Sequence, residues 1–280
     1  MVDAAIKKAD VLIEALPYIK NFQGKIFVIK YGGSILGEER VRKGILEDIA
    51  FLRFAGICPV LIHGGGPYIS ERLKNENTPV KFIDGMRVTT KTTLKVAEEE
   101  LSKLNDLISE EIAAHGVKVT PFKGDLLEVV KKSDKDLGFV GTVVGFDQKA
   151  LIKSVNGSIP VIVPLGKSKD GQLYNINADD VACYIAAQLK AKKLVLLTKV
   201  LGVMKNVDDP QSLISTIDKK TADELISNEV IDSGMVPKVR AAIESVQTGV
   251  GKAHIVDAKM PHALLLEIFT DKGIGTEIIA

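Results

Sequence analysis

Residues 59–67 read Pro59-Val60-Leu61-Ile62-His63-Gly64-Gly65-Gly66-Pro67, and this stretch decides the fold that we expect. Its apolar first half predicts a buried strand that ends at His63. Three glycines then open a turn into a helix beginning near Pro67, since proline is favoured in the first helical turn. Bare glycine N–H groups beside a helix N-terminus suit an anion.

A second glycine turn precedes this one. Ile26-Phe27-Val28-Ile29-Lys30 predicts another strand, and Tyr31-Gly32-Gly33-Ser34 follows it. Either turn alone is more often structural, because glycine follows strands in many α/β proteins. Two such turns, one with Lys30 at its mouth, predict a phosphate site.

Composition narrows the functional class. Of 280 residues, 46% are hydrophobic and 26% charged, with a formal net charge of +1. This balance allows a large core and two lobes, and it argues against nucleic acid or an anionic membrane as partner. No apolar run approaches the ~20 residues of a membrane span. Cys58 and Cys183 are the only cysteines, which indicates reduced thiols in an intracellular protein.

Short apolar runs alternate with longer amphipathic stretches along the chain. This alternation predicts an α/β fold with an open, mostly parallel sheet between layers of helices. Strands are predicted at 26–30, 59–63, 117–121, 139–145, 159–164, 194–198, 253–256 and 275–279. Helices are predicted at 3–20, 41–55, 67–76, 91–115, 177–190, 220–227, 238–248 and 261–269. The polar stretch 166–171 is the expected boundary between two lobes.

The first helix has no obvious partner in the sheet. Val11, Leu12, Ala15, Leu16 and Ile19 fall at helical spacing on one face, while Pro17 is expected to kink or end the helix. We leave two alternatives open. The helix packs on its own lobe, or it reaches a neighbouring subunit.

Three further segments carry polar residues in informative positions. Asn175, Asn177 and Asp179 alternate before an alanine-rich helix, so they share one side if the segment is extended. The structural alternative is a helix cap by Asn177 or Asp179. Arg87, in Gly85-Met86-Arg87-Val88-Thr89, suits a carboxylate, although an arginine taken alone is more often a surface residue. Lys238 stands in the first turn of a helix, where the dipole disfavours it and a phosphate would compensate.

Taken in order, six motifs resemble N-acetylglutamate kinase, of the amino acid kinase family. The likeness runs from about Val11 to Ile279 and includes an extra N-terminal helix, as in the arginine-sensitive type. The motifs are Lys30–Gly33, His63–Pro67, Gly85–Thr89, Asn175–Asp179, Gly234–Lys238 and Leu264–Thr270.

The resemblance implies transfer of the γ-phosphoryl group of ATP to the side-chain carboxylate of N-acetyl-L-glutamate, in arginine biosynthesis. It implies residues 1–20 as an oligomerisation helix, 21–170 as a lobe for acetylglutamate and dimerisation, and 171–280 as a lobe for ATP and arginine. Mg²⁺ would be carried with ATP, without a protein ligand that we can name.

The resemblance also implies roles for single residues. Lys30 and Lys238 would flank the transferred phosphoryl group, with Asp179 holding both ammonium groups. The other expected contacts are substrate-binding Gly32, Gly33, Gly65, Gly66, Arg87, Asn175 and Asn177, and nucleotide-binding Thr198, Lys199, Gly202 and Lys238. Lys199 stands where the family usually has Asp or Asn, which leaves the details of ATP binding open.

Arginine-sensitive relatives bind arginine between the N-terminal helix and the C-terminal lobe, and they assemble as hexamers made of three dimers. The positions that match this inhibitor site are Tyr18, Lys193, His254, Glu267 and Gly273. The insertion 208–214 resembles that of relatives that bind the signalling protein PII, which becomes a further expected partner.

Two rival functions remain. One is a kinase for an aminoadipate-type substrate, which the segment around Arg87 disfavours. The other is an arginine-binding regulatory subunit with weak catalysis, against which Lys30, Asp179 and Lys238 count. The expected location is the cytoplasm, or a plastid if a transit peptide has been removed.

Overall fold

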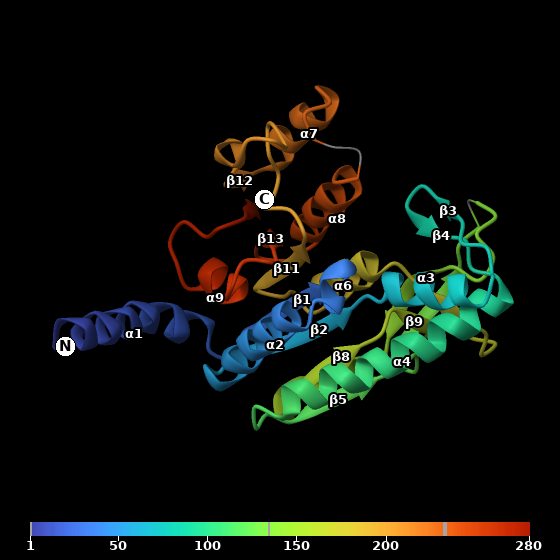
Figure 1. The fold of residues 1–280 in the computed structure, drawn as a ribbon, viewed down its shortest axis with the longest axis horizontal. Helices are drawn as coiled ribbons and strands as arrows, with labels where there is room; N and C mark the ends of the chain where they lie inside the picture. Colours follow the sequence, from blue (N-terminus) through green and yellow to red (C-terminus); the bar gives the residue numbers. More distant parts are fainter. Residues whose placement is uncertain (1, 134, 232–233) are drawn as a thin grey trace.

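The computed structural model describes residues 2–133, 135–231 and 234–280, and it has the predicted α/β architecture (Figure 1). Eight strands form a sheet in the order β12-β14-β13-β11-β1-β2-β8-β5. All neighbours in it are parallel except β13 and β14. The carboxyl ends of β1, β2 and β11 therefore lie along one edge, which is where ligands of parallel sheets bind.

The strands of this sheet agree with the prediction to within a few residues. They are β1 Ile26–Tyr31, β2 Cys58–His63, β5 Val119–Phe122, β8 Ile159–Ile162, β11 Lys193–Thr198, β12 Thr216–Ile217, β13 Ala253–Asp257 and β14 Thr276–Ile278. Only the two-residue β12 was not predicted.

All eight predicted helices form. The nine α-helices in the described part of the chain are α1 Val2–Phe22, α2 Glu39–Phe54, α3 Gly66–Asn75, α4 Lys91–Ala113, α5 Gln148–Gly157, α6 Ala178–Gln188, α7 Lys219–Ser227, α8 Val236–Gln247 and α9 Ala263–Ile268. Short 3₁₀ turns occur at Ser34–Gly37 and Pro210–Ser212. Helix α5 was not predicted, and the side chain of Asp147 caps it by accepting from the N–H of Ala150.

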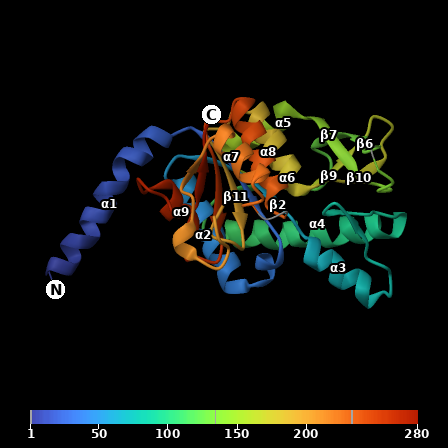
Figure 2. The same cartoon turned by 90° about the horizontal axis from the view of Figure 1, so that it is seen from above.

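Helices cover both faces of the large sheet (Figure 2). Alternate residues of β1 show the two sides: Val28 packs with α5, α6 and α8, whereas Phe27 and Ile29 pack with α2, α4 and α9. Because these strands are buried on both faces, they read as continuous apolar runs. The resulting core fixes the strand ends from which the polar residues project.

Smaller sheets lie beside the large one. A four-stranded sheet has the order β10-β9-β6-β7, and β3 with β4 forms a hairpin. Their bounds are β3 Phe82–Ile83, β4 Met86–Arg87, β6 Leu127–Lys131, β7 Gly141–Phe146, β9 Leu165–Lys167 and β10 Leu173–Asn175. Of these only β7 was predicted. The strands are short, which leaves little period for a sequence pattern to show.

The stretch 166–171, where we expected the lobe boundary, includes the turn of the hairpin between β9 and β10. The N–H of Ser168 donates to the carbonyl of Gln172, and Gly171 adopts φ +85°. A polar, glycine-containing hairpin and a polar linker look alike in sequence. The division of the chain at residue 170 stays a prediction.

Helix α1 projects from the body of the molecule (Figures 1 and 2). It continues past Pro17 to Phe22, so the helix does not end at Pro17, and a kink there stays a prediction. Pro17 is exposed, so solvent can hydrate the carbonyl that its missing N–H leaves unpaired. Ile13 and Leu16 are 66% and 57% exposed. The side chains of Val11 and Leu12 lie outside what the structure describes.

The chain from Val2 onward, apart from the three internal residues that the structure leaves out, has no helix that is both long and apolar enough to span a bilayer.

Candidate active site

The two glycine turns lie against each other at the carboxyl edge of the sheet. Strands β1 and β2 pair in register, and the N–H of Gly64 donates to the carbonyl of Tyr31 at 2.8 Å. A Cβ on Gly32 would lie 3.1 Å from the Cα of Gly64, so the turns could not approach this closely with a side chain there. Gly33 has φ +81°, which also favours glycine. The two turns for which we predicted a phosphate site therefore lie in direct contact.

Three charged side chains from three elements meet beside these turns. The Nζ of Lys30, from β1, lies 2.9 Å from Oδ1 of Asp179 in the first turn of α6. The ammonium group of Lys238, from the first turn of α8, pairs with the other carboxylate oxygen. These side chains are 11%, 14% and 26% exposed for Lys30, Asp179 and Lys238.

Burial alone would raise the pKa of Asp179, but the two ammonium groups outweigh it and lower the pKa to about 2. The carboxylate is therefore ionised near neutral pH. It also neutralises one of the two positive charges, which lets both lysines remain close together in a partly dehydrated place. The arrangement leaves a net positive charge for an anionic ligand.

The segment with alternating polar residues serves both alternatives that we left open. Asn177 caps α6, because its Oδ1 accepts from the N–H groups of Asp179 and Asp180 at 2.7 and 3.4 Å. Asn175 lies on β10 and donates its amide to Oγ1 of Thr89 at 3.2 Å. Asn175, Asn177 and Asp179 nevertheless line one cleft, beside the two glycine turns.

Arg87 lies on β4, at the far wall of that cleft, and is only 8% exposed. Its Nη2 donates to the carbonyl of Gly66 at 2.8 Å and to Oγ of Ser70 at 2.7 Å. The guanidinium stacks over the ring of Phe82, 4.8 Å from its centre. Its Nη1 is buried without a hydrogen-bond partner among the described residues. A buried guanidinium nitrogen with no protein acceptor favours an anionic ligand at this place.

The cleft between these residues has a volume of about 230 Å³. It gathers most of the predicted catalytic and substrate residues from segments that are far apart in the sequence. Those that line it are Lys30, Gly33, Gly65, Gly66, Arg87, Asn175, Asn177 and Asp179. Gly32 and Lys238 do not line the cleft themselves. Gly32 packs against Gly64, and Lys238 pairs with Asp179, and both of these partners line it.

Of the four predicted nucleotide residues, Lys238 belongs to the charged cluster, whereas Thr198, Lys199 and Gly202 lie elsewhere along the same edge, at the end of β11 and after it. Thr198 ends β11 and donates its hydroxyl to the carbonyl of Val200 at 2.9 Å, and Lys199 is exposed. Gly202 has a packing reason of its own, since a Cβ there would lie 2.5 Å from Oγ1 of Thr276. Within the described chain, no hydrogen bond or ion pair joins these three residues to the cleft, so their nucleotide role stays a prediction.

The sequence left the metal ligands unassigned. Within residues 2–133, 135–231 and 234–280, no group of three or more His, Cys, Asp or Glu side chains could hold an ion. A cation that enters with ATP would be held by phosphate oxygens.

A second pocket, of about 270 Å³, lies between the C-terminal turn of α1 and the strands β11 and β13. All five residues that we expected at an arginine site line it: Tyr18, Lys193, His254, Glu267 and Gly273. Tyr18 donates its hydroxyl to Asp271 and packs edge-on against Phe269.

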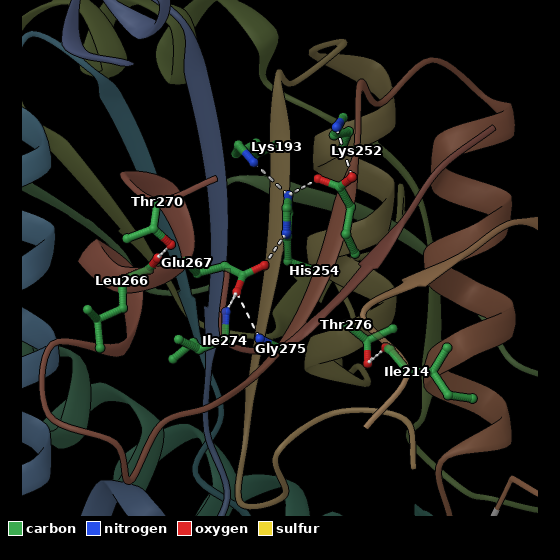
Figure 3. Close-up of polar contacts among 11 residues, drawn as sticks. Lys193, Ile214, Lys252, His254, Leu266, Glu267, Thr270, Ile274, Gly275 and Thr276 are labelled. Atoms are coloured by element: carbon green, nitrogen blue, oxygen red, sulfur yellow. Dashed lines mark hydrogen bonds and ion pairs between the residues drawn. The ribbon is translucent and has the colours of Figure 1, made fainter. Parts of the chain in front are cut away.

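Three of these side chains form a buried chain of polar contacts (Figure 3). The Nζ of Lys193 lies 2.8 Å from Nε2 of His254, whose Nδ1 lies 2.6 Å from Oε1 of Glu267. Oε2 of Glu267 accepts from the N–H groups of Ile274 and Gly275. Burial lowers the pKa of Lys193 to about 8 and the pKa of His254 below its usual value. The amine of Lys193 donates to one ring nitrogen of His254, and the carboxylate of Glu267 accepts from the other. The three side chains therefore form one network.

Gly273 packs directly against this network, at the carboxylate of Glu267. It has φ +60°, and a Cβ there would lie 2.7 Å from Oε2 of Glu267. The glycine therefore lets the loop wrap the carboxylate.

Sequence reasoning missed several residues around both sites. Ser70 and Thr89 support Arg87 and Asn175, and Glu277 lines the second pocket with Lys252 bound to it at 2.8 Å. Ser and Thr hydroxyls give no local pattern, so nothing in the sequence marked them. Glu277 carried one signal, since it is a charged residue in the last predicted strand.

The chain is similar to known proteins over most of its length. Residues 25–257 match the model of the amino acid kinase family. The acetylglutamate kinase of Halothermothrix orenii is 46% identical over 98% of both chains.

Two solved structures of the N-acetylglutamate synthase of Neisseria gonorrhoeae share the fold, each at 26% identity over 97% of this chain. The complex with coenzyme A and N-acetyl-glutamate has a TM-score of 0.88, and the complex with coenzyme A and L-arginine has 0.83. This chain spans only 63% and 65% of those two chains.

A parallel sheet with two glycine turns and a Lys–Asp–Lys cluster at its carboxyl edge defines a phosphoryl-transfer protein of the α/β class. Its full-length likeness to curated acetylglutamate kinases is more specific. The chain belongs to the amino acid kinase family, in its acetylglutamate kinase branch.

Proposed function

We propose that this enzyme transfers the γ-phosphoryl group of ATP to the side-chain carboxylate of N-acetyl-L-glutamate and forms N-acetyl-L-glutamyl 5-phosphate for arginine biosynthesis. The observation that carries the proposal is Asp179 between Lys30 and Lys238, beside two glycine turns. The likeness to acetylglutamate kinases supports the substrate.

The reaction asks for charge stabilisation more than for acid–base chemistry. A carboxylate oxygen of acetylglutamate attacks the γ-phosphorus, a new P–O bond forms, and the bond to the β-phosphate oxygen breaks to release ADP. The nucleophile is already ionised, so no general base is needed. The obstacle is the approach of one anion to another, which positioning and fixed positive charge overcome.

Each part of the site has a role in this scheme. Lys30 and Lys238 stabilise the transferred phosphoryl group from two sides, and Asp179 keeps both ammonium groups in place. The N–H groups of Gly33 and Gly65 donate to phosphoryl oxygens. Mg²⁺ accompanies the phosphates of ATP.

Arg87 binds the α-carboxylate of acetylglutamate. Its Nη1 has no acceptor among the described residues, and Nη2 is already fixed by Gly66 and Ser70. Asn175 contributes beside it. Phe82, stacked on the guanidinium, limits the directions in which Arg87 can turn.

Arginine is the feedback inhibitor in this proposal, and the second pocket is its site. Support comes from five predicted residues that line one pocket, with Glu267 and Glu277 available to a cationic ligand. Helix α9 carries Glu267, and its N-terminal neighbour His262 contacts Asp48 of α2 through Nδ1 at 2.7 Å. Binding at the pocket can therefore act on α2 through α9, provided that arginine prefers one arrangement of the two helices.

The projecting helix α1 supports a hexamer made of three dimers. Ile6, Ile13 and Leu16 are each more than half exposed, and their helical spacing gathers them on one face, as is typical of an association surface. A symmetry-related helix of another subunit would bury them. The cytoplasmic location and the binding of PII at 208–214 stay predictions from the sequence.

One assay separates the proposal from its rivals. The purified enzyme, ATP and Mg²⁺ are incubated with hydroxylamine, which traps an acyl phosphate as a hydroxamate. We expect hydroxamate with N-acetyl-L-glutamate and much less with N-acetyl-L-aminoadipate. Faster reaction with the aminoadipate would favour the rival kinase, and no hydroxamate together with arginine binding would favour the regulatory subunit.

A further inference from the structure

The inference concerns His63, which precedes the glycine turn. It is the last residue of β2, it is completely buried, and the chemical step proposed above does not use it. It pairs in register with Tyr31 at the end of β1, so it lies directly under the two glycine turns. Because water does not reach this buried ring, its two nitrogens need hydrogen-bond partners within the protein.

Both ring nitrogens have partners, and these partners fix the protonation state. Nδ1 lies 3.0 Å from the carbonyl oxygen of Gly64, and Nε2 lies 3.1 Å from Nδ2 of Asn105 on α4. A carbonyl oxygen only accepts, so Nδ1 carries the proton.

Asn105 determines the state of the other nitrogen. Its Nδ2 also lies 3.1 Å from the carbonyl oxygen of Val161, which again only accepts. The atom that faces both groups must therefore be the amide nitrogen, and it donates to Nε2. Asn105 is 0% exposed, so water does not compete for its amide nitrogen. Burial lowers the pKa of His63 to about 4, which keeps the ring neutral and consistent with this pattern.

The carbonyl of Gly64 determines where the next N–H points. The described chain has no cis peptide bond, and in a trans peptide the C=O and the following N–H point in opposite directions. The imidazole holds the Gly64 oxygen toward the protein interior. The N–H of Gly65 is then directed away from it, on the side where Gly64, Gly65 and Gly66 line the cleft.

Glycine by itself would not hold this orientation. A turn of three glycines has the greatest backbone freedom of any tripeptide, so the Gly64–Gly65 peptide plane could rotate. The N–H of Gly64 is already fixed by the carbonyl of Tyr31. The hydrogen bond from His63 fixes the other end of the same residue.

We propose that His63 is a positioning residue for phosphoryl transfer: its Nδ1–H, held by Asn105 through Nε2, fixes the Gly64 carbonyl and thereby aims the Gly65 N–H at the transferred phosphoryl group. The inference rests on the proposed kinase function. It adds a residue that touches neither substrate and acts through a peptide plane.

A matched pair of substitutions tests it. His63→Asn places an amide nitrogen near the position of Nδ1 and keeps a donor for Gly64, whereas His63→Gln reaches the position of Nε2 and loses that donor. We expect kcat to fall about 10- to 100-fold in His63→Gln. His63→Asn should retain clearly more activity, and KM for acetylglutamate should change less than about threefold in both variants.

The melting temperatures of the two variants should rank in the opposite order to their activities. This difference separates a positioning role of the ring from a role in filling space. Asn leaves the larger void, so His63→Asn should melt at the lower temperature. The less stable variant is therefore expected to be the more active one. If His63→Gln is as active as His63→Asn or more active, the inference is wrong. His115→Asn, an exposed histidine at the end of α4, is the matched control and should leave kcat unchanged.

A measurement on the unaltered protein covers the case in which a variant does not fold. The chain has only four histidines, so solid-state NMR of ¹⁵N-histidine-labelled enzyme can resolve their ring nitrogens. We expect the neutral tautomer with the proton on Nδ1 for His63 and no protonation above about pH 5. A proton on Nε2 would overturn the inference. This readout needs no substrate, so it stands apart from any failure of the proposed function.

Discussion

The carboxylate of Asp179 lies 2.9 Å from the ammonium group of Lys30, although one comes from helix α6 and the other from strand β1. The contact closes the cleft at the carboxyl edge of the sheet. Since Lys238 binds the second oxygen of the same carboxylate, Asp179 sets the separation of two positive charges. The first predictions concern these charges.

Removal of either lysine should slow the chemical step. Each ammonium group meets charge that moves during phosphoryl transfer, so Lys30→Ala and Lys238→Ala should lower kcat by about 10²-fold or more, beyond any rise in KM. Steady-state kinetics with both substrates check this. Lys43→Ala, an exposed lysine on α2, should behave like the parent enzyme. A kcat within about threefold of the parent in either active-site variant would contradict the assignment.

Arg87→Lys should separate the two substrates. The single ammonium group of lysine cannot bind Gly66, Ser70 and a carboxylate in the fixed planar arrangement of a guanidinium group, so we expect KM for acetylglutamate to rise about tenfold or more, while KM for ATP changes little. Ser70→Ala is a useful companion, because it removes one acceptor that holds Nη2 and should have a smaller effect in the same direction. Equal losses of affinity for both substrates would show that Arg87 does not bind acetylglutamate.

Acid stability should depend on Asp179. Its pKa is lowered to about 2 in the folded chain, from an ordinary 3.8. The folded state therefore binds this proton less tightly than the unfolded state does. The stabilisation is complete above about pH 4 and is lost as the pH falls toward 2.

Urea unfolding at pH 7 and pH 3 measures this loss. Asp179→Asn should be less stable at pH 7, because two ammonium groups then lack their counter-charge, and it should lose less stability on acidification than the parent. Asp208→Asn, in an exposed turn, provides the control. The same acid dependence in Asp179→Asn and in the parent would refute the prediction.

Arginine inhibition should weaken as the pH rises through about 8. Burial lowers the pKa of Lys193 to about 8, so the amine is charged at pH 7 and largely neutral at pH 9. If its ammonium group binds the carboxylate of arginine, deprotonation removes that contact. The arginine concentration for half inhibition should rise several-fold between pH 7 and pH 9. Lys193→Met should need more arginine at pH 7 and show a flatter pH profile, and an unchanged profile would exclude this role.

Deletion of residues 1–20 should change assembly and inhibition together. The exposed Ile13 and Leu16 are removed, and burial of such apolar surface favours association by roughly 25 cal/mol per Å² before the entropy of association is subtracted. We expect a hexamer to become dimers, and more arginine to be needed for inhibition because Tyr18 is also removed. Catalysis without arginine should be largely retained. Light scattering and activity against arginine measure all three, and unchanged mass with unchanged inhibition would contradict this function of α1.

The sequence alone determined the order of the elements and the chemistry of the strand ends. Buried strands such as 26–30 and 59–63 read as continuous apolar runs, and the glycines after them include Gly32 and Gly65, where a Cβ would crowd a neighbouring residue. Lys30 stood out because it precedes a glycine turn at a strand end. Lys238 stood out because a lysine is unfavourable at a helix start, and Asp179 because one helix cap does not need three alternating polar residues. Such signals are local, so they can be read without knowing which segments meet.

The tertiary structure alone decided which of these residues meet, and what holds them. The short strands β6, β9 and β10 form a sheet only through their neighbours, so no local period revealed them. Gly202 was expected at the nucleotide, yet its contact with Thr276 gives it a packing reason that only the fold reveals. His63 and Asn105 come from a strand and a helix far apart in the chain, and neither residue has a local pattern. Their hydrogen bond exists only because the sheet and α4 bury both, where an unpaired polar group would be costly.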